Sequence, residues 1–222
     1  MKQKNLRQLK AMAYIILPLI GAGLACVSCS EEDNTVDEWA DWQKKNDTYW
    51  NSLYSETQQR ISSGDKSWRI LTVWSKDEKY ELKTTDRIIV HVLNEGKGTE
   101  QPLYTDTVRV HYVGWLIPSA SYAGGYQFDK SYSDDSFDTE TSIPAKGALS
   151  GFTDGFATAL LNMHQGDHWR IYVPYTLGYG ANVHGSIPAY STLIFEVTLA
   201  SFWHPGTRVP EWGAKPAPFF GD

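Results

Sequence analysis

Apolar and polar positions follow two different periods along the chain, and residues 36–61 have the period of a helix. Apolar and aromatic side chains recur there three, four and seven positions apart, which predicts an amphipathic helix. We expect its apolar stripe to pack on the rest of the domain; pairing of two subunits and capture of unfolded polypeptides are the alternatives. The stripe consists of Trp39, Trp42, Tyr49, Trp50, Leu53, Tyr54 and Ile61.

Most of the remaining chain has the period of strands. Residues 68–74 alternate and are rich in aromatic and β-branched side chains, which predicts a strand that extends or edges a larger sheet. Four further strands are predicted at residues 88–93, 108–116, 169–173 and 193–199.

One short helix is predicted among these strands. Ser150 is expected to cap its N-terminus, Asp154 lies in its first turn, and Gly166 ends it. Its apolar stripe consists of Phe152, Phe156, Leu160 and Met163. Many strands with one short helix predict an α+β fold, in which an antiparallel sheet carries the helix on one face.

The first segment has the composition of an export signal. Four basic residues within the first ten precede an apolar run at 11–27 that ends in small residues. Pro18, Gly21 and Gly23 interrupt this run, which is shorter than the roughly 20 apolar residues of a spanning helix. Residues 1–28 are therefore predicted to be a signal peptide.

The end of that signal points to a lipid anchor. Cys29 is followed by one serine and three acidic residues, and this sequence resembles the signal of Bacteroidetes lipoproteins, in which the cysteine is acylated and becomes the first residue. The resemblance implies lipid attachment to the outer membrane, with the protein in the periplasm or exposed on the cell surface. Cys26 is the alternative site of acylation.

Composition and charge narrow the classes of function. The 222 residues are 41% hydrophobic and 21% charged, as expected of a chain that buries a core. Both cysteines lie within the first 30 residues, so neither a disulfide framework nor a cysteine-based zinc site can hold the body together. Residues 1–28 contain four of the 20 basic residues and no acidic one, which leaves 16 basic against 26 acidic residues, a formal net charge of −10. This charge excludes nucleic-acid binding, which needs a basic surface.

Seven short motifs occur in order between residues 87 and 202. They are V-H-Y-V-G at 110–114, F-D at 128–129, G-F at 151–152, M-x-x-G-D at 163–167, V-P at 173–174 with Y-G-A at 179–181, I-P at 187–188, and T-L-I-F-E-V at 192–197. The ordered set resembles the FKBP family of peptidyl-prolyl cis-trans isomerases. The resemblance implies a bent antiparallel sheet wrapped on one short helix, with a hydrophobic pocket between them. The N-terminal amphipathic helix is an extension outside the resemblance.

Carried over position by position, the resemblance implies a site that needs no nucleophile, metal or cofactor. Asp129 is the acidic group near the reacting amide, Leu149 offers its backbone N–H to a substrate carbonyl, and the Tyr179 hydroxyl holds another carbonyl. Leu149 and its neighbour Ala148 stand where the family has a Val-Ile pair. The wall that binds the substrate consists of Tyr112, Phe128, Phe137, Ala148, Phe152, Ile187 and Phe195.

Two departures from the family pattern bear on activity. Phe152 stands where the most active members have Trp, and the loop at 117–127 is longer than usual, so reduced activity is expected. A peptide-binding or chaperone module of the same fold, without catalysis, is the alternative function. His164 and His168 do not indicate a zinc site, because Gly166 breaks the helical face that such a pair needs.

These interpretations divide the chain into five segments. A signal peptide at 1–28 is followed by an acidic tether at 29–35, a helix-and-strand extension at 36–85, an isomerase domain at 86–203 and a proline-rich tail at 204–222. The expected partners are proline-containing polypeptides among the exported proteins, with macrolide inhibitors as candidate ligands. The pattern leaves the oligomeric state open.

Overall fold

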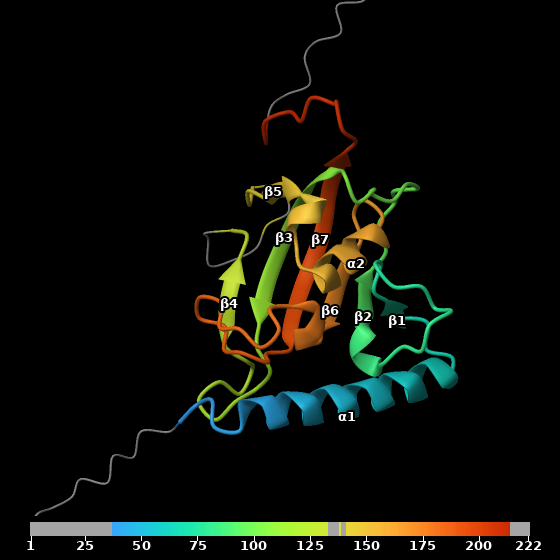
Figure 1. The fold of residues 1–222 in the computed structure, drawn as a ribbon. Coiled ribbons are helices and arrows are strands. Elements are labelled where there is room, and N and C mark those ends of the chain that lie inside the picture. The colour runs from blue at the N-terminus through green and yellow to red at the C-terminus, as the bar shows by residue number, and fades with distance from the viewer. Residues whose placement is uncertain (1–36, 133–137, 139–140, 214–222) are drawn as a thin grey trace, which may run out of the picture. The chain divides into compact units, whose positions relative to one another are not determined.

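The computed structural model describes residues 37–132, 138 and 141–213. In this part of the chain seven strands form one antiparallel sheet in the order β1-β2-β6-β7-β3-β4, and β5 also pairs with β3 (Figure 1). The strands are β1 (Trp68–Thr72), β2 (Arg87–Asn94), β3 (Thr107–Trp115), β4 (Gln127–Lys130), β5 (Ala145–Ala148), β6 (His168–Val173) and β7 (Leu193–Trp203).

The central strands alternate between two faces, which we call the helix face and the outer face. On β6, Trp169 and Ile171 are buried on the helix face, whereas Arg170 and Tyr172 lie on the outer face. Register carries this alternation from strand to strand, because directly paired residues lie on the same face. On the outer face Tyr172 is paired with Ile194 of β7.

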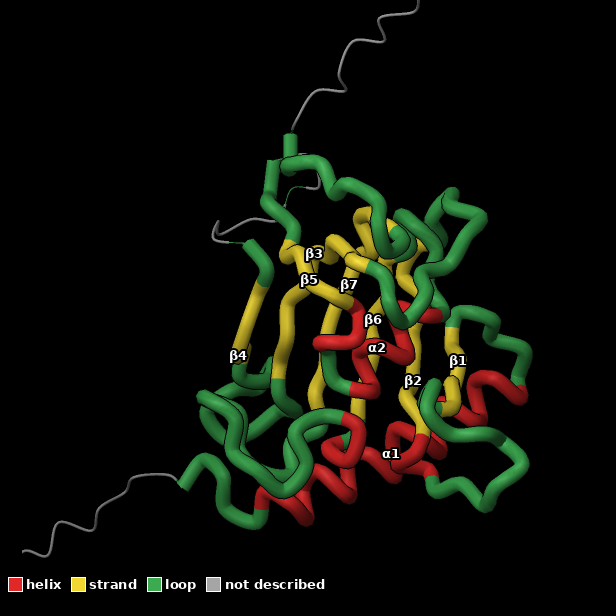
Figure 2. The backbone as a smooth tube through the Cα atoms, turned by 45° about the horizontal axis from the view of Figure 1, so that its top comes forward, coloured by secondary structure: helices red, strands yellow, loops and turns green. Residues whose placement is uncertain are grey.

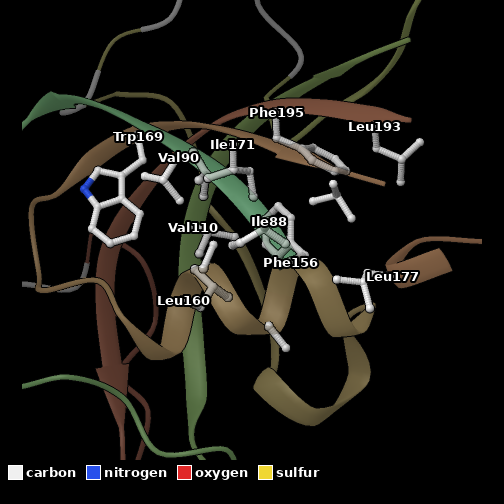
Figure 3. Packing of buried hydrophobic residues seen from close by; sticks show 14 of the residues in the cluster. Ile88, Val90, Val110, Phe156, Leu160, Trp169, Ile171, Leu177, Leu193 and Phe195 are labelled. Atoms are coloured by element: carbon white, nitrogen blue, oxygen red, sulfur yellow. The ribbon is translucent and has the colours of Figure 1, made fainter. Parts of the chain in front are cut away.

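Helix α2 (Asp154–Leu161) covers the helix face and closes the main core (Figure 2). Its Phe156 and Leu160 lie among side chains of the central strands, including Val110, Ile171 and Phe195 (Figure 3). Phe156 is 4% exposed and Leu160 is completely buried. Burial of apolar area on this scale is the main stabilising term of the domain.

The position of α2 corrects one detail of the predicted helix. The helix begins at Asp154 with Thr153 as its N-cap residue, and it ends at Leu161, before Gly166. The predicted cap Ser150 belongs instead to a short 3-10 helix, η2 (Leu149–Gly151). Phe152 therefore precedes α2, and its side chain lines a cleft beside the start of the helix.

Helix α1 (Trp42–Ser62) packs across one end of the strands (Figure 1). Trp50 is 2% exposed and packs with Ile89 and Tyr172 of the outer face. The Trp42 indole N–H donates to the Ser191 hydroxyl at 2.8 Å. The expected packing of the apolar stripe on the domain is thus confirmed for Trp42 and Trp50, while Ile61 at the end of the helix stays exposed.

The α+β fold, with an antiparallel sheet, few helices and an N-terminal helix, is confirmed. Within the described residues, no helix is both long enough and apolar enough to span a membrane. The predicted signal peptide and Cys29 lie outside the described residues.

Candidate functional site

A cleft of about 290 Å³ opens where the start of α2 meets β3, β4, β7 and the loop after residue 178. Most of its lining is aromatic, with one carboxylate and one imidazole at the edge. The lining residues are Tyr112, Phe128, Asp129, Gly151, Phe152, Thr153, Phe156, Tyr179, His184 and Phe195.

Phe195 of β7 lies at the centre of the aromatic lining. The rings of Phe128 and Phe156 meet it edge to face, with centroids 5.5 Å and 4.9 Å from its own. Phe152 stacks on Phe156 with centroids 5.0 Å apart. Edge-to-face and offset contacts of this kind are favourable and leave a firm apolar floor.

Gly114 on β3 makes room for this arrangement. A Cβ atom added at Gly114 would lie 2.5 Å from the ring of Phe128 and 2.9 Å from the ring of Phe195. The bare backbone therefore lets the two rings lie against the strand, which explains the glycine in the V-H-Y-V-G motif.

Asp129 and Tyr112 form a hydrogen bond at the edge of the floor. β4 pairs with β3 so that Asp129 faces Gly114 in register, and the Tyr112 hydroxyl donates to the Asp129 carboxylate at 2.6 Å. Burial raises the pKa of Tyr112, and this hydrogen bond raises it further. Burial also raises the pKa of Tyr179, with a smaller contribution from the charge of Asp129. Both phenols therefore remain protonated at neutral pH and can donate hydrogen bonds.

A tight turn brings His184 to the same edge. The backbone groups of His184 and Ile187 bond to each other in both directions at 2.9 Å, and Gly185 between them has a φ of 57°. The imidazole of His184 stacks on the Tyr179 ring with centroids 3.9 Å apart and planes 6° apart. This contact restricts the ring that carries the Tyr179 hydroxyl.

The structure brings together six of the residues that the sequence analysis assigned to the site. These are Tyr112, Phe128, Asp129, Phe152, Tyr179 and Phe195. Their roles toward a substrate remain predictions.

The other assigned residues lie elsewhere. Ile187 is 4% exposed and belongs to the core, where it anchors the turn that presents His184. Ala148 is exposed at the end of β5 and does not line the cleft. The Leu149 side chain is completely buried, and its backbone N–H already donates to the Asp106 carbonyl at 2.8 Å. A substrate carbonyl would have to share or replace that acceptor. Phe137 lies outside the described residues.

Four lining residues were missing from the assigned set. Phe156 was interpreted as part of the helix stripe, because a core residue and a floor residue have the same helical spacing. Its position four residues after Phe152 was the available signal. Gly151 and Thr153 flank Phe152, and His184 lies in a loop where spacing alone carries little information.

Within the described residues, no group of three or more His, Cys, Asp or Glu side chains is arranged to hold a metal ion. His164 and His168 have separate neighbours. The His164 ring lies 3.7 Å from the Asp167 carboxylate, and the His168 ring lies 3.9 Å from the Glu196 carboxylate.

Comparison with known proteins identifies the family to which the chain belongs. The family model described as FKBP-type peptidyl-prolyl cis-trans isomerase matches residues 98–200. FK506-binding protein 1 of Aspergillus oryzae is 33% identical over 111 residues, which cover 49% of this chain and 91% of that protein. The chain therefore belongs to the FKBP-type peptidyl-prolyl cis-trans isomerase family.

Longer relatives share the same part of the chain. The FKBP-type 22 kDa peptidyl-prolyl cis-trans isomerase of Escherichia coli K12 is 39% identical over 109 residues, 49% of this chain and 46% of that protein. The macrophage infectivity potentiator of Trypanosoma cruzi is 32% identical over 121 residues, 54% of this chain and 55% of that protein. The chain thus spans about half the length of these two relatives.

A solved structure agrees with the fold. The crystal structure of a peptidyl-prolyl cis-trans isomerase from Pseudomonas syringae pv. tomato superimposes with a TM-score of 0.50 at 22% identity, covering 74% of this chain and 95% of that one. At this identity the likeness supports the fold alone.

Proposed function

We propose that the protein is a peptidyl-prolyl cis-trans isomerase that acts on X-Pro bonds of exported polypeptides. The observation that carries the proposal is the cleft, in which an aromatic floor lies beside the hydroxyls of Tyr112 and Tyr179 and the carboxylate of Asp129. Its volume of about 290 Å³ is close to the lower end of the roughly 300–1,000 Å³ of ligand sites. Family membership supports the same reaction.

The chemistry requires no bond to break. Amide resonance opposes rotation with a barrier of about 18–20 kcal/mol, so an uncatalysed X-Pro bond isomerises in tens to hundreds of seconds. A site that binds the twisted amide better than the planar one lowers this barrier, by about 1.4 kcal/mol for each tenfold gain in rate. An apolar floor disfavours the charge-separated planar form, and fixed donors hold the carbonyl of the twisted form.

Each part of the cleft takes one of these tasks in our proposal. The rings of Phe128, Phe152 and Phe195 receive the proline ring. The Tyr179 hydroxyl donates to a substrate carbonyl, and the stacking of the Tyr179 ring on His184 fixes its position. Asp129 accepts a hydrogen bond from the Tyr112 hydroxyl and places a negative charge beside the twisted amide.

A slow catalyst is expected, because Phe152 offers less area to the proline ring than an indole does. A peptide-binding or chaperone module without catalysis is the second candidate, favoured by Phe152 and by the engaged Leu149 N–H. Macrolide inhibitors are candidate ligands of the same apolar floor.

Magnetisation exchange between the cis and trans forms of a short X-Pro peptide tests the proposal. We expect the purified protein to accelerate exchange, and an Asp129→Ala variant to lose the acceleration while circular dichroism shows that it remains folded. Peptide binding without acceleration would leave the binding module as the function. Acceleration that survives the substitution would place the reaction away from Asp129.

We also propose that the chain is a lipoprotein of the cell envelope, acylated at Cys29 after removal of residues 1–28 and anchored to the outer membrane. The basic and apolar signal and the acidic residues after Cys29 support this proposal. In cells fed a labelled fatty acid, Cys29→Ser should abolish labelling of the protein. Label that persists in Cys29→Ser and disappears in Cys26→Ser would move the anchor to Cys26.

A further inference from the structure

The aromatic cleft carries one carboxylate whose charge no basic side chain of the cleft balances. Asp129 lies at the exposed edge of the aromatic floor. The lining contains no lysine or arginine, and none of the ion pairs among the described residues involves Asp129. Because an exposed carboxylate is ionised at neutral pH, the edge of the cleft has an uncompensated negative charge.

Strand alternation directs the neighbouring lysine away from the cleft. β4 lies at the edge of the sheet beside β3 (Figure 1), with Asp129 in register with Gly114 and Lys130 in register with Val113. Gly114 faces the rings of the cleft, so its neighbour Val113 and the paired Lys130 lie on the outer face. The Lys130 ammonium lies over the Tyr132 ring, 5.1 Å from its centroid. Lys130 is therefore not a cation of the cleft.

The next strand places its lysine on the outer face as well. Lys146 of β5 is in register with Arg109 of the outer face. A Cβ atom at the adjacent Gly147 would lie 3.6 Å from the Phe152 ring, so Gly147 faces the cleft and Lys146 points the other way. Residues 131–145, which link β4 to β5, include four acidic residues and no basic one. This part of the chain thus supplies no cation to the cleft.

The Asp129 carboxylate has room for another donor. Oδ2 accepts the Tyr112 hydroxyl at 2.6 Å, and Oδ1 accepts the Lys130 backbone N–H at 2.8 Å. An ionised carboxylate has about four acceptor positions on its two oxygens, so these two bonds leave part of its capacity unused. A cationic donor suits the remaining positions best, because hydrogen bonds between charged groups are shorter and stronger than neutral ones.

The negative charge of Asp129 is felt inside the cleft. Burial is the main cause of the raised pKa of Tyr112 and of Tyr179, and the charge of Asp129 raises the pKa of both phenols further. A charge that disfavours a second negative charge on these two residues also stabilises a positive charge bound near them.

The rings beside Asp129 suit the rest of a basic side chain. Arginine and lysine have apolar stems that pack along apolar surface while the charged end stays at a polar edge. A cation over an aromatic ring is also favourable. Phe128 and Tyr112 line the cleft next to the Asp129 carboxylate, so stem and charge can be accommodated together.

We propose that the cleft prefers X-Pro bonds in which X is arginine or lysine, with Asp129 as the specificity-determining residue. This proposal rests on the isomerase function proposed above and names its substrate class. The side chain of X begins beside the twisted amide and extends its charge to the carboxylate, while the proline ring packs on the floor. The ion pair forms with the planar and the twisted amide alike, so the preference should lie in KM and not in kcat.

Exchange spectroscopy with two blocked peptides, acetyl-Ala-Arg-Pro-Ala-amide and its citrulline counterpart, tests the proposal. Citrulline has nearly the shape of arginine but no charge, so the ratio of the two kcat/KM values isolates the charge. At low ionic strength we expect the protein to favour the arginine peptide by roughly threefold to fivefold, as for an exposed ion pair. Because His184 lies at the same edge, the measurement is made at about pH 8, where histidine side chains are normally uncharged. Equal values for the two peptides would overturn the proposal.

Two variants separate Asp129 from the overall negative charge of the protein. Asp129→Asn keeps an acceptor for the Tyr112 hydroxyl and removes the charge, so the ratio should fall toward one even if the rates for both peptides decrease. Glu100→Gln removes the same formal charge at an exposed position outside the cleft lining and should keep the ratio. A ratio that survives in Asp129→Asn would assign the preference to another group.

Salt provides a test that needs no substitution. Raising the ionic strength from about 0.01 M to 1 M shortens the Debye length from about 30 Å to about 3 Å. The ratio in the original protein should therefore decrease with added salt. An undiminished ratio would contradict an electrostatic origin and overturn the proposal.

Failure of this proposal and failure of the isomerase proposal give different results. Acceleration that is equal for the two peptides removes the preference and leaves the isomerase intact. If neither peptide is accelerated, the isomerase proposal fails, and the affinities of the same peptides, measured by titration with nuclear magnetic resonance, decide the question. Tighter binding of the arginine peptide that is lost in Asp129→Asn would support the preference, and equal affinities would overturn it.

Discussion

The two faces of the sheet differ in what covers them, although the central strands contribute to both. The helix face is covered by α2 and opens into the aromatic cleft around Phe195, where we propose that isomerisation takes place. Among the described residues, the outer face is covered at its ends by α1 and by the segment that carries Trp212. The residues matched by the family model thus form the cleft on one face, while two segments outside that match, α1 and the segment that carries Trp212, cover the ends of the other.

The largest expected effect comes from the contact that attaches α1 to the outer face. Trp50 is 2% exposed among Ile89 and Tyr172, so Trp50→Ala should lower the free energy of unfolding by about 3–5 kcal/mol. Urea denaturation measures the change. Ile61→Ala on the same helix is the control, because Ile61 is 39% exposed and should cost well under about 1 kcal/mol. Equal losses would mean that α1 does not depend on its buried stripe.

The next effect concerns the donor in the cleft. Tyr179→Phe keeps the ring that stacks on His184 and removes the hydroxyl, so we expect a roughly tenfold to hundredfold loss of isomerisation rate with little change in stability. Exchange spectroscopy measures the rate. Tyr80→Phe removes a hydroxyl from a side chain that is 64% exposed and should leave the rate unchanged. A full rate in Tyr179→Phe would remove this hydroxyl from the mechanism.

The next prediction concerns the stability of the protein at alkaline pH, which depends on Tyr49 on the outer face. Burial raises the pKa of Tyr49 to about 12, whereas an unfolded tyrosine ionises near pH 10. The folded state therefore holds this proton more tightly, and its stabilisation, present below pH 10, is lost as the pH rises toward 12. Denaturation at successive pH values should show a decline that is shallower in Tyr49→Phe. An unchanged slope in that variant would contradict the assignment to Tyr49.

The smallest expected effect is a gain. Phe152→Trp extends the ring beside Phe156 and offers more apolar area to a proline ring, so we expect a roughly twofold to fivefold faster isomerisation. The ratio of rates for the two proteins, measured with one peptide, reports the change. A slower variant would mean that the cleft is already filled by the phenylalanine.

Periodicity located the elements well where the pattern was long. The helical spacing in 36–61 identified α1, but the start was misplaced because Asp41 adopts a left-handed backbone with a φ of 54° and the regular helix begins after it. The four-residue strands β4 and β5 were not predicted, since four residues carry too few alternations. The five longer strands were each found within a few residues of their bounds.

The site was predictable as far as the motifs reach. Asp129 and Tyr179 were found because each lies in a short ordered motif, and the structure brings both to one cleft. The engaged N–H of Leu149 could not be found in the same way, because its acceptor Asp106 is 43 residues away in sequence. The meeting of Tyr49, Trp115 and Gly124 on the outer face could not be predicted for a similar reason, since these residues come together only through the tertiary fold.

The most direct test of the catalytic cleft is to fill it without unfolding the protein. A Cβ atom at Gly151 has no heavy atom within 4 Å, and Gly151 lines the cleft, so Gly151→Leu should obstruct it. Ser150→Leu at the exposed neighbouring position is the control. We predict that exchange of a short X-Pro peptide is accelerated by the original protein and by Ser150→Leu but not by Gly151→Leu. Undiminished acceleration by Gly151→Leu, or none by the original protein, would contradict the account.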